Sequence, residues 1–135
     1  MVGVAVQKPK ANKERDAWVA TVERLVRQVE SWATKRSWPV HRDVKEIRES
    51  RIGTYQVPTL SILSPSGTIQ VDPVARYVGR TDGRVDLLAW PSMNRILLIL
   101  QDDIWKIKTD SGVSWPQKWG PKAFAYLAHS LHANS

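Results

Sequence analysis

The sequence predicts an α+β domain in which a long N-terminal helix and a short C-terminal helix pack on an antiparallel meander sheet of five or six strands. Three observations predict it. Near the N-terminus, apolar residues recur at steps of three and four. Short runs rich in Val, Ile and Trp follow, separated by clusters of Pro, Gly, Asn and Asp. A second apolar stripe lies near the C-terminus. The outer patterns are typical of amphipathic helices and the middle one of strands joined by turns. Because a lone sheet cannot hide its apolar face, we expect the helices to cover one side of it.

The N-terminal region predicts a flexible arm and then a helix. Residues 1–11 form the arm, and residues 12–135 form a single domain. Asn12 suits the N-cap of a helix over 13–36, which ends before Pro39 because a residue that precedes proline leaves helical geometry. Its buried face is a stripe of Trp18, Val22, Leu25, Val26, Val29, Trp32 and Ala33.

The middle of the chain predicts hairpins. Residues 40–56 fit either a strand or a short helix, and we favour an edge strand because charged side chains protect an exposed edge. Residues 57–78 predict a hairpin around the turn at 64–67. A second tight turn is expected at 80–84, where Asp82-Gly83 supplies the positive φ angles.

Residues 84–108 contain three short apolar runs that continue the meander. The central run, 96–100, does not alternate between apolar and polar residues, so we expect both of its faces to be buried. Residues 109–121 are too rich in Gly and Pro for a long element, and Pro121 suits the first position of a final helix. That helix has an apolar stripe of Phe124, Leu127, Ala128 and Leu131.

Composition excludes several classes of protein. The 135 residues include no cysteine, which excludes disulfides, thiolate nucleophiles and cysteine-zinc sites. Apolar runs are far shorter than the roughly 20 residues needed to span a bilayer, and the N-terminus lacks the pattern of a secretory signal. We therefore expect a cytoplasmic protein without membrane contact.

The charge is unevenly distributed. The formal net charge is +7, and residues 1–51 hold 12 Lys and Arg against 7 Asp and Glu. Such an excess would attract an acidic or nucleic-acid partner through a salt-sensitive field. A solvated face of a mildly basic protein explains the same charge without any partner.

Carboxylates on the predicted strands are the candidate catalytic residues. Asp72 and Asp86 lie on consecutive strands, and Lys106 lies on a later one. A metal-dependent nuclease of the restriction-endonuclease-like type uses an Asp on one strand and an acid-x-Lys on the next to hold Mg²⁺ and activate water. The strand after Asp86 has no acid, and Asp103 precedes Lys106 by one residue too many. The competing interpretation pairs Asp86 with a basic residue such as Arg95.

His129 and His132 are the candidate metal ligands. They stand three residues apart on the final helix, a spacing that can place two imidazoles on one ion. A metal site needs a third ligand, which the neighbouring sequence does not supply, and histidines also complement the dipole at a helix C-terminus. Without a complete ligand set or a phosphate-binding glycine loop, we expect no metal and no cofactor.

The candidate binding residues are aromatic and basic. Trp38, Trp115 and Trp119 lie in proline-rich connections where no periodicity explains their burial, and Arg80 and Arg84 flank a turn. Tryptophan and arginine are typical of interfaces and of base-stacking surfaces. The alternative is that the tryptophans close the open end of the sheet.

These observations favour a non-enzymatic binding or accessory module for a macromolecular or anionic partner. The alternatives are the Mg²⁺-dependent nuclease and a non-specific nucleic-acid binder that uses the basic first helix. Two helices cannot cover both faces of the sheet unless they divide between them. Otherwise the loop around 115–119, or a second copy in a homodimer, would have to cover the other face.

Overall fold

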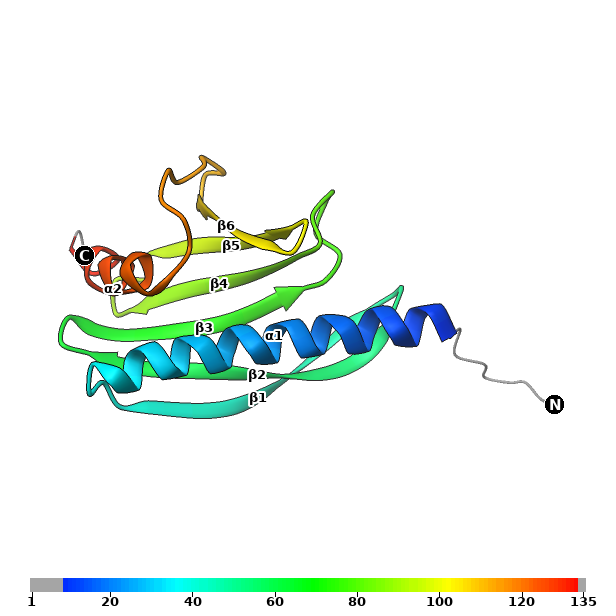
Figure 1. The fold of residues 1–135 in the computed structure, drawn as a ribbon, viewed down its shortest axis with the longest axis horizontal. Helices are drawn as coiled ribbons and strands as arrows, with labels where there is room; N and C mark the ends of the chain where they lie inside the picture. Colours follow the sequence, from blue (N-terminus) through cyan, green and yellow to red (C-terminus); the bar gives the residue numbers. More distant parts are fainter. Residues whose placement is uncertain (1–8, 134–135) are drawn as a thin grey trace.

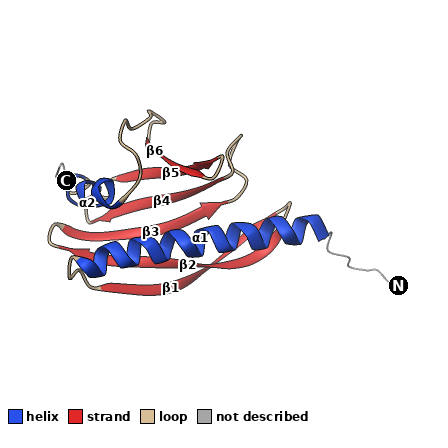
Figure 2. Ribbon diagram, viewed as in Figure 1, coloured by secondary structure: helices blue, strands red, loops and turns tan. Residues whose placement is uncertain are grey.

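The computed structural model describes residues 9–133 and confirms the predicted α+β fold (Figures 1 and 2). Helix α1, Pro9–Lys35, comes first, and helix α2, Pro121–Ser130, comes last. Between them lie the six strands of one antiparallel sheet, β1 Val40–Glu49, β2 Gly53–Ser64, β3 Gly67–Ala75, β4 Gly83–Trp90, β5 Arg95–Gln101 and β6 Ile104–Thr109. Their order in the sheet is their order in the chain, so β1 and β6 are its two edges.

Helix α1 starts earlier than predicted. It begins at Pro9, whose fixed φ and missing N–H suit the first helical position, so the prediction that Asn12 is the N-cap is wrong. Residues 9–11 of the predicted arm belong to this helix, and residues 1–8 lie outside the described residues. The helix ends close to the predicted end, because Ser37 adopts a φ of 61° and Trp38 N donates to Ala33 O at 3.0 Å. This arrangement is a Schellman C-cap.

Both helices pack on the same face of the sheet. The predicted α1 stripe is buried apart from half-buried Trp32, and its residues join those of α2 in one core. Aromatic rings link the two helices, with centroids 6.0 Å apart for Trp32 and Phe124 and 5.9 Å apart for Trp38 and Phe124. The alternative in which the helices divide between the two faces is therefore wrong.

The predicted strands are present, with one change in a turn. The expected edge strand spans residues 40–49 and not 40–56, because residues 53–56 begin β2, and β2 and β3 form the expected hairpin. The turn at 80–84 is instead a longer loop over 76–82, and Gly83 opens β4. A Cβ on Gly83 would lie 2.2 Å from the ring of Trp18, so this position requires glycine because α1 packs directly on it.

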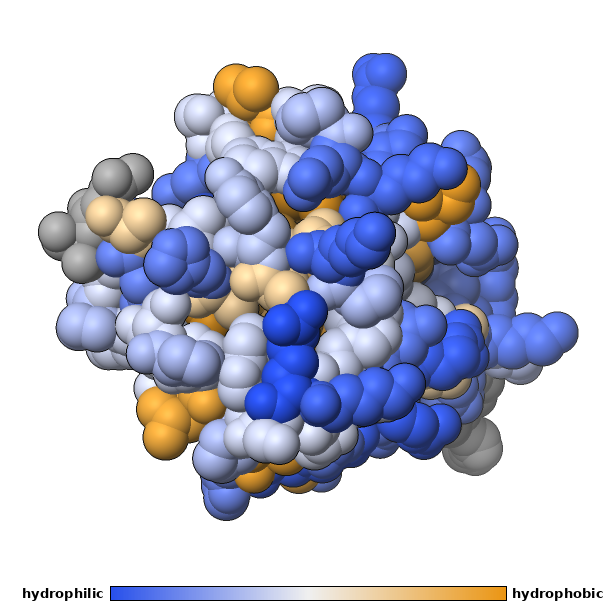
Figure 3. Space-filling view, turned by 60° about the vertical axis from the view of Figure 1, so that its left-hand side comes forward, coloured by the Kyte–Doolittle hydropathy of each residue, from blue (hydrophilic) through white to orange (hydrophobic). Residues whose placement is uncertain are grey.

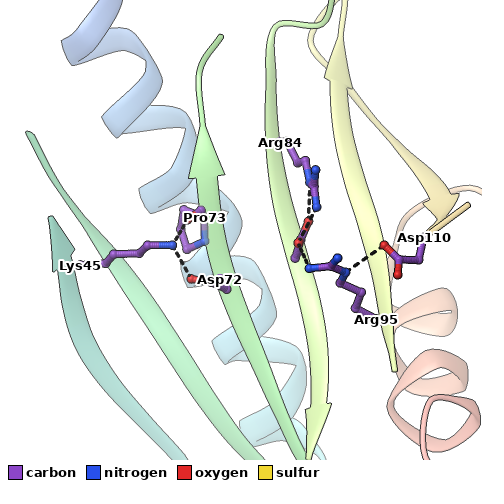
Figure 4. A network of polar contacts seen from close by, with 7 residues as sticks. Lys45, Asp72, Pro73, Arg84, Arg95 and Asp110 are labelled. Carbon is purple, nitrogen blue, oxygen red and sulfur yellow. Dashed lines mark hydrogen bonds and ion pairs between the residues drawn. The ribbon is translucent and has the colours of Figure 1, made fainter. Parts of the chain in front are cut away.

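The sheet face opposite the helices is polar at its centre. Lys45 contacts Asp72 and the carbonyl of Pro73, and Arg84 and Arg95 bind the Asp86 carboxylate between them (Figure 4). Water can cover such a surface without a partner, since its charges are solvated or paired.

The run 96–100 of β5 is buried on both faces apart from half-buried Leu97, as predicted. Ile99, on the open face, is only 4% exposed, and its cross-strand neighbours are Arg84 and Lys106. The aliphatic stems of long basic side chains cover apolar neighbours in this way. Leu97 is half-buried.

The loop over 110–120 packs beside α1 and α2, where Trp119 contacts Trp32. The prediction that this loop covers the second face is therefore wrong. The homodimer stays a prediction.

Exposed apolar residues do not form one continuous surface on the side of the molecule drawn in Figure 3. That view shows the α2 end, where hydrophobic residues occur as small separate patches among hydrophilic ones. Scattered apolar residues of this kind are normal on a protein surface and mark no site. The candidate site is found instead along the β6 edge.

Candidate functional site

A groove of about 700 Å³ lies between α1, edge strand β6 and the loop that leads to α2. Its walls are aromatic, because four of the seven tryptophans line it, namely Trp32, Trp105, Trp115 and Trp119. We call this the tryptophan groove. Two of its members, Trp115 and Trp119, are predicted binding residues, and the structure brings them together.

The edge of β6, and not merely one of its faces, forms a wall of the groove. All five consecutive residues from Asp103 to Ile107 line it. Successive side chains of a strand point to opposite faces of a sheet, so a single face would supply only alternate residues. The groove therefore wraps around the free side of the strand, where its backbone is within reach.

Hydrogen-bonding groups of the β6 backbone point toward this free side. The β5–β6 hairpin turns at Asp102-Asp103, whose φ angles are 51° and 62°, and it pairs Gln101 with Ile104. In an antiparallel ladder, alternate residues direct their N–H and C=O groups to the same neighbour. Ile104 thus faces β5, and Trp105 and Ile107 face outward.

Part of the outward edge is already paired. Trp115 N donates to Ile107 O at 2.8 Å, and Thr109 N donates to Val113 O at 2.8 Å. Within the described residues this backbone pairing stops at Trp115. Within residues 9–133, the N–H and C=O groups of Trp105 and the N–H of Ile107 are left without a strand on this side.

The loop tryptophans are held by other rings. The Trp119 ring lies 5.4 Å from the Trp32 ring, and the Trp115 ring lies 6.0 Å from that of Tyr126. The Nε1 atom of Trp119 is buried and makes no hydrogen bond in the described structure. A buried N–H without a partner is uncommon, and an incoming acceptor would satisfy it.

Basic residues outnumber acidic ones around the groove. Lys106 and Lys118 line it, against the single carboxylate of Asp103. Lys108 and Lys122 stand next to the lining residues in the chain. The local charge therefore favours an acidic occupant over a basic one.

The other predicted binding residues lie elsewhere. Trp38 packs on Phe124 and under the guanidinium of Arg36, at 5.5 Å. Arg84 donates to Asp86 at 2.8 and 2.9 Å, and these hydrogen bonds raise the pKa of Arg84 above its usual value. Arg80 is exposed in the loop over 76–82. Arg80 and Arg84 therefore do not flank one tight turn, as the sequence had predicted.

The candidate catalytic residues are partly brought together. Asp72 and Asp86 are cross-strand partners on the open face, but Lys45 Nζ binds Asp72 at 2.8 Å and Arg84 binds Asp86. Arg95 also contacts Asp86, at 3.7 Å, as the competing interpretation expects. Lys106 is exposed on β6 beside Ile99, not beside either carboxylate. Because both carboxylates bind basic side chains, a divalent cation would first have to displace these cations.

The two histidines have separate partners. His129 Nδ1 lies 2.9 Å from Ser66 Oγ, and the ring of His132 packs against Gly67. No group of three His, Asp or Glu side chains with the geometry of a metal site occurs among residues 9–133.

Sequence reasoning missed two lining residues, Trp32 and Trp105. Their periodicity explains them as parts of a helix stripe and a strand, and both do pack partly against the core. A usable signal was that residues 104–109 are the last run of a meander, since the last strand of a meander is an edge.

Comparisons with protein-family models, with curated proteins and with solved structures found no match to this chain. No helix within the described residues is long and apolar enough to cross a membrane.

Proposed function

We propose that this protein is a non-enzymatic binding module that takes an extended segment of a partner protein into the tryptophan groove. The segment adds to the sheet as a strand beside β6. In this mode of recognition, main-chain hydrogen bonds supply affinity, and pockets for alternate side chains supply specificity.

The observation that carries the proposal is the lining of the groove by four consecutive residues of an edge strand, Ile104 to Ile107. A groove made for a small apolar molecule would use side chains of one face. This groove combines free backbone groups of Trp105 and Ile107 with aromatic walls. An extended peptide offers both the backbone and the side chains that such a site requires.

The chemistry of the groove indicates the kind of segment. Alternate side chains of an added strand would lie against the tryptophans, so every second residue should be apolar. Lys106 and Lys118 favour acidic residues between them. We therefore expect a short segment that alternates apolar residues with Asp or Glu.

Selection from a random peptide library on the intact protein tests this proposal. The best selected peptide is then compared, by fluorescence titration of the tryptophans, with the same peptide methylated on alternate backbone nitrogens. Methylation of the nitrogens that face β6 should abolish binding, and methylation of the nitrogens that face away should not. Equal affinity for both methylated forms would disprove strand addition.

Substitution of Trp115 provides a second readout. Trp115→Ala should weaken binding of the selected peptide by about tenfold. This corresponds to a loss of binding free energy of about 1–2 kcal/mol, which is typical when an important interface residue is truncated. Trp38→Ala is the matched control, because Trp38 is a partly buried aromatic residue outside the groove. Circular dichroism of both variants checks that the fold is kept.

A further inference from the structure

A second hollow, of about 490 Å³, lies where the start of α1 meets the β1–β2 turn and the loop after β3. Its volume falls within the range of small-molecule sites, roughly 300–1,000 Å³. Lys10, Arg51 and Tyr77 line it from these three segments. We call it the Arg51 pocket.

Two guanidinium groups stack on one aromatic ring at this pocket. The Cζ atoms of Arg51 and Arg76 lie 4.8 and 4.7 Å from the centre of the Tyr77 ring. Both distances are within the roughly 6 Å at which a cation is attracted to an aromatic face. The ring therefore attracts two positive charges, one from Arg51, which lines the pocket, and one from Arg76, which does not line it.

The positive charge of the pocket is only partly offset by the protein. In the part of the chain that the structure describes, no carboxylate forms a salt bridge with Lys10, Arg51 or Arg76. Glu14 is the one acid among the lining residues, and the Glu49 carboxylate lies against the backbone of the loop that carries Arg76. The pocket is thus a concave surface with an excess of positive charge.

A relay of hydrogen bonds holds the loop that carries Arg76 and Tyr77. The Glu49 carboxylate accepts from the backbone nitrogens of both residues, at 2.9 Å each. It also accepts from the Tyr55 hydroxyl, which itself accepts from Trp18 Nε1 at 3.1 Å. Burial, and then the hydrogen bond to Glu49, raise the pKa of Tyr55. The two stacking residues are therefore presented from a fixed backbone.

We propose that the Arg51 pocket binds a nucleotide through its phosphate. Guanidinium groups form planar forks that match phosphate oxygens, and they also stack on the flat face of a base. Aromatic and arginine side chains beside a positive pocket are the combination used for nucleotides in single strands. The nucleotide can be a free molecule or a unit of a nucleic-acid strand, because both present the same phosphate and base. This proposal is independent of the tryptophan groove.

Calorimetric titration of the intact protein tests the proposal with three probes, which are inorganic phosphate, adenosine monophosphate and a 12-nucleotide oligothymidylate. We expect saturable binding of at least one nucleotide probe that weakens as salt rises. Arg51→Gln should weaken it by about tenfold, or about 1.4 kcal/mol. Arg36→Gln is the matched control, because Arg36 is exposed and stacks on Trp38 beyond the other end of α1.

The outcomes separate the sources of the ligand. Binding of the monophosphate assigns the pocket to a free nucleotide, and binding of the oligonucleotide alone assigns it to a strand. Absence of binding by all three probes, or binding of inorganic phosphate with no gain from the nucleoside, would overturn the proposal. An equal loss in Arg36→Gln would also overturn it, because general charge and not the pocket would then explain the affinity. Circular dichroism verifies that both variants fold.

Discussion

The two edges of the sheet are built differently, although each exposes one large aliphatic side chain to a similar extent, Val44 at 62% on β1 and Ile104 at 60% on β6. Strand β1 has ten residues, of which seven are charged or polar, and five of those seven are exposed. Strand β6 has six, and it borders the tryptophan groove. Charged side chains on an edge oppose pairing with another chain, so β1, with six charged residues, is better protected than β6, which has two.

The β1 edge is also tied to the helix layer. Arg42 donates to Glu23 at 2.9 Å and to Glu30 at 3.0 Å, which links β1 to two turns of α1. Edge strand β6 is covered by its own loop only as far as Trp115. The difference teaches that this fold ties one edge to the helix layer through charged side chains and leaves part of the other edge without a covering strand.

Both edge strands are held in place by one hydrophobic core. Leu25→Ala tests how much α1 contributes to that core, and it has the largest expected effect. Leu25, on the buried face of α1, is 1% exposed. Its truncation should lower the free energy of unfolding by about 2–5 kcal/mol, as for other buried leucines. Urea denaturation measures it, and Arg24→Ala, on the exposed side of the same helix turn, should change stability by less than about 0.5 kcal/mol. Equal effects would show that the stripe is not packed on the sheet.

Tyr55→Phe tests the part of the β1–β2 hairpin that lies next to its turn. The change removes the hydroxyl that joins Trp18 to Glu49, so we expect a loss of about 1–3 kcal/mol, because buried partners lose their hydrogen bonds. The raised pKa of Tyr55 has a further consequence for the pH dependence of stability. The protonated hydroxyl stabilises the fold below the unfolded pKa of about 10, and this stability is lost as pH rises further. Thermal melts from pH 7 to 11 should show a steeper decline in the wild type than in Tyr55→Phe.

The two matched aliphatic positions test the edges directly. Ile104→Glu places a negative charge on the open edge, where it would repel the acidic residues expected in the segment, and should weaken binding of the library-selected peptide by about tenfold, or about 1.4 kcal/mol. Val44→Glu adds the same charge to the protected edge and should leave the affinity unchanged. If the β1 variant weakened binding as much as the β6 variant, the open edge would not be the binding site.

The smallest expected effect concerns the link between β1 and α1. The hydrogen bond from Arg42 lowers the pKa of Glu23. A lowered pKa stabilises the fold above the unfolded value of about 4.3, and this contribution is lost as pH falls through the folded value. Because the pair is about one-third exposed, Glu23→Gln should cost no more than about 1 kcal/mol at pH 7 and nothing at low pH. Denaturant midpoints at pH 7 and pH 3 measure the difference, and an equal loss at both values would contradict it.

Much of the secondary structure could be predicted because it depends on neighbours in the chain. The α1 stripe, the hairpin around 64–67 and Pro121 at the start of α2 follow from local periodicity and turn chemistry. The start of α1 could not be predicted as reliably, because Pro9 and Asn12 both suit a helix terminus. The need for glycine at position 83 comes from a distant tryptophan, not from a turn.

The candidate sites depended on contacts between distant segments. Trp115 and Trp119 stood out by sequence alone, because no periodicity explained them. Trp105 did not, since its strand already accounted for it. Arg51 lies in the β1–β2 turn and Arg76 and Tyr77 lie in the loop after β3, and Glu49 holds that loop where the two segments meet.

The sequence by itself determined the class of fold, the absence of cysteine chemistry and the identity of the aromatic residues without a periodic role. Local propensity and hydrophobic pattern suffice for these, because they act over a few residues. Only the tertiary structure decided that both helices share one face, that paired charges occupy the other, and that β6 is the open edge. These depend on packing between segments far apart in the chain, which no short-range pattern encodes.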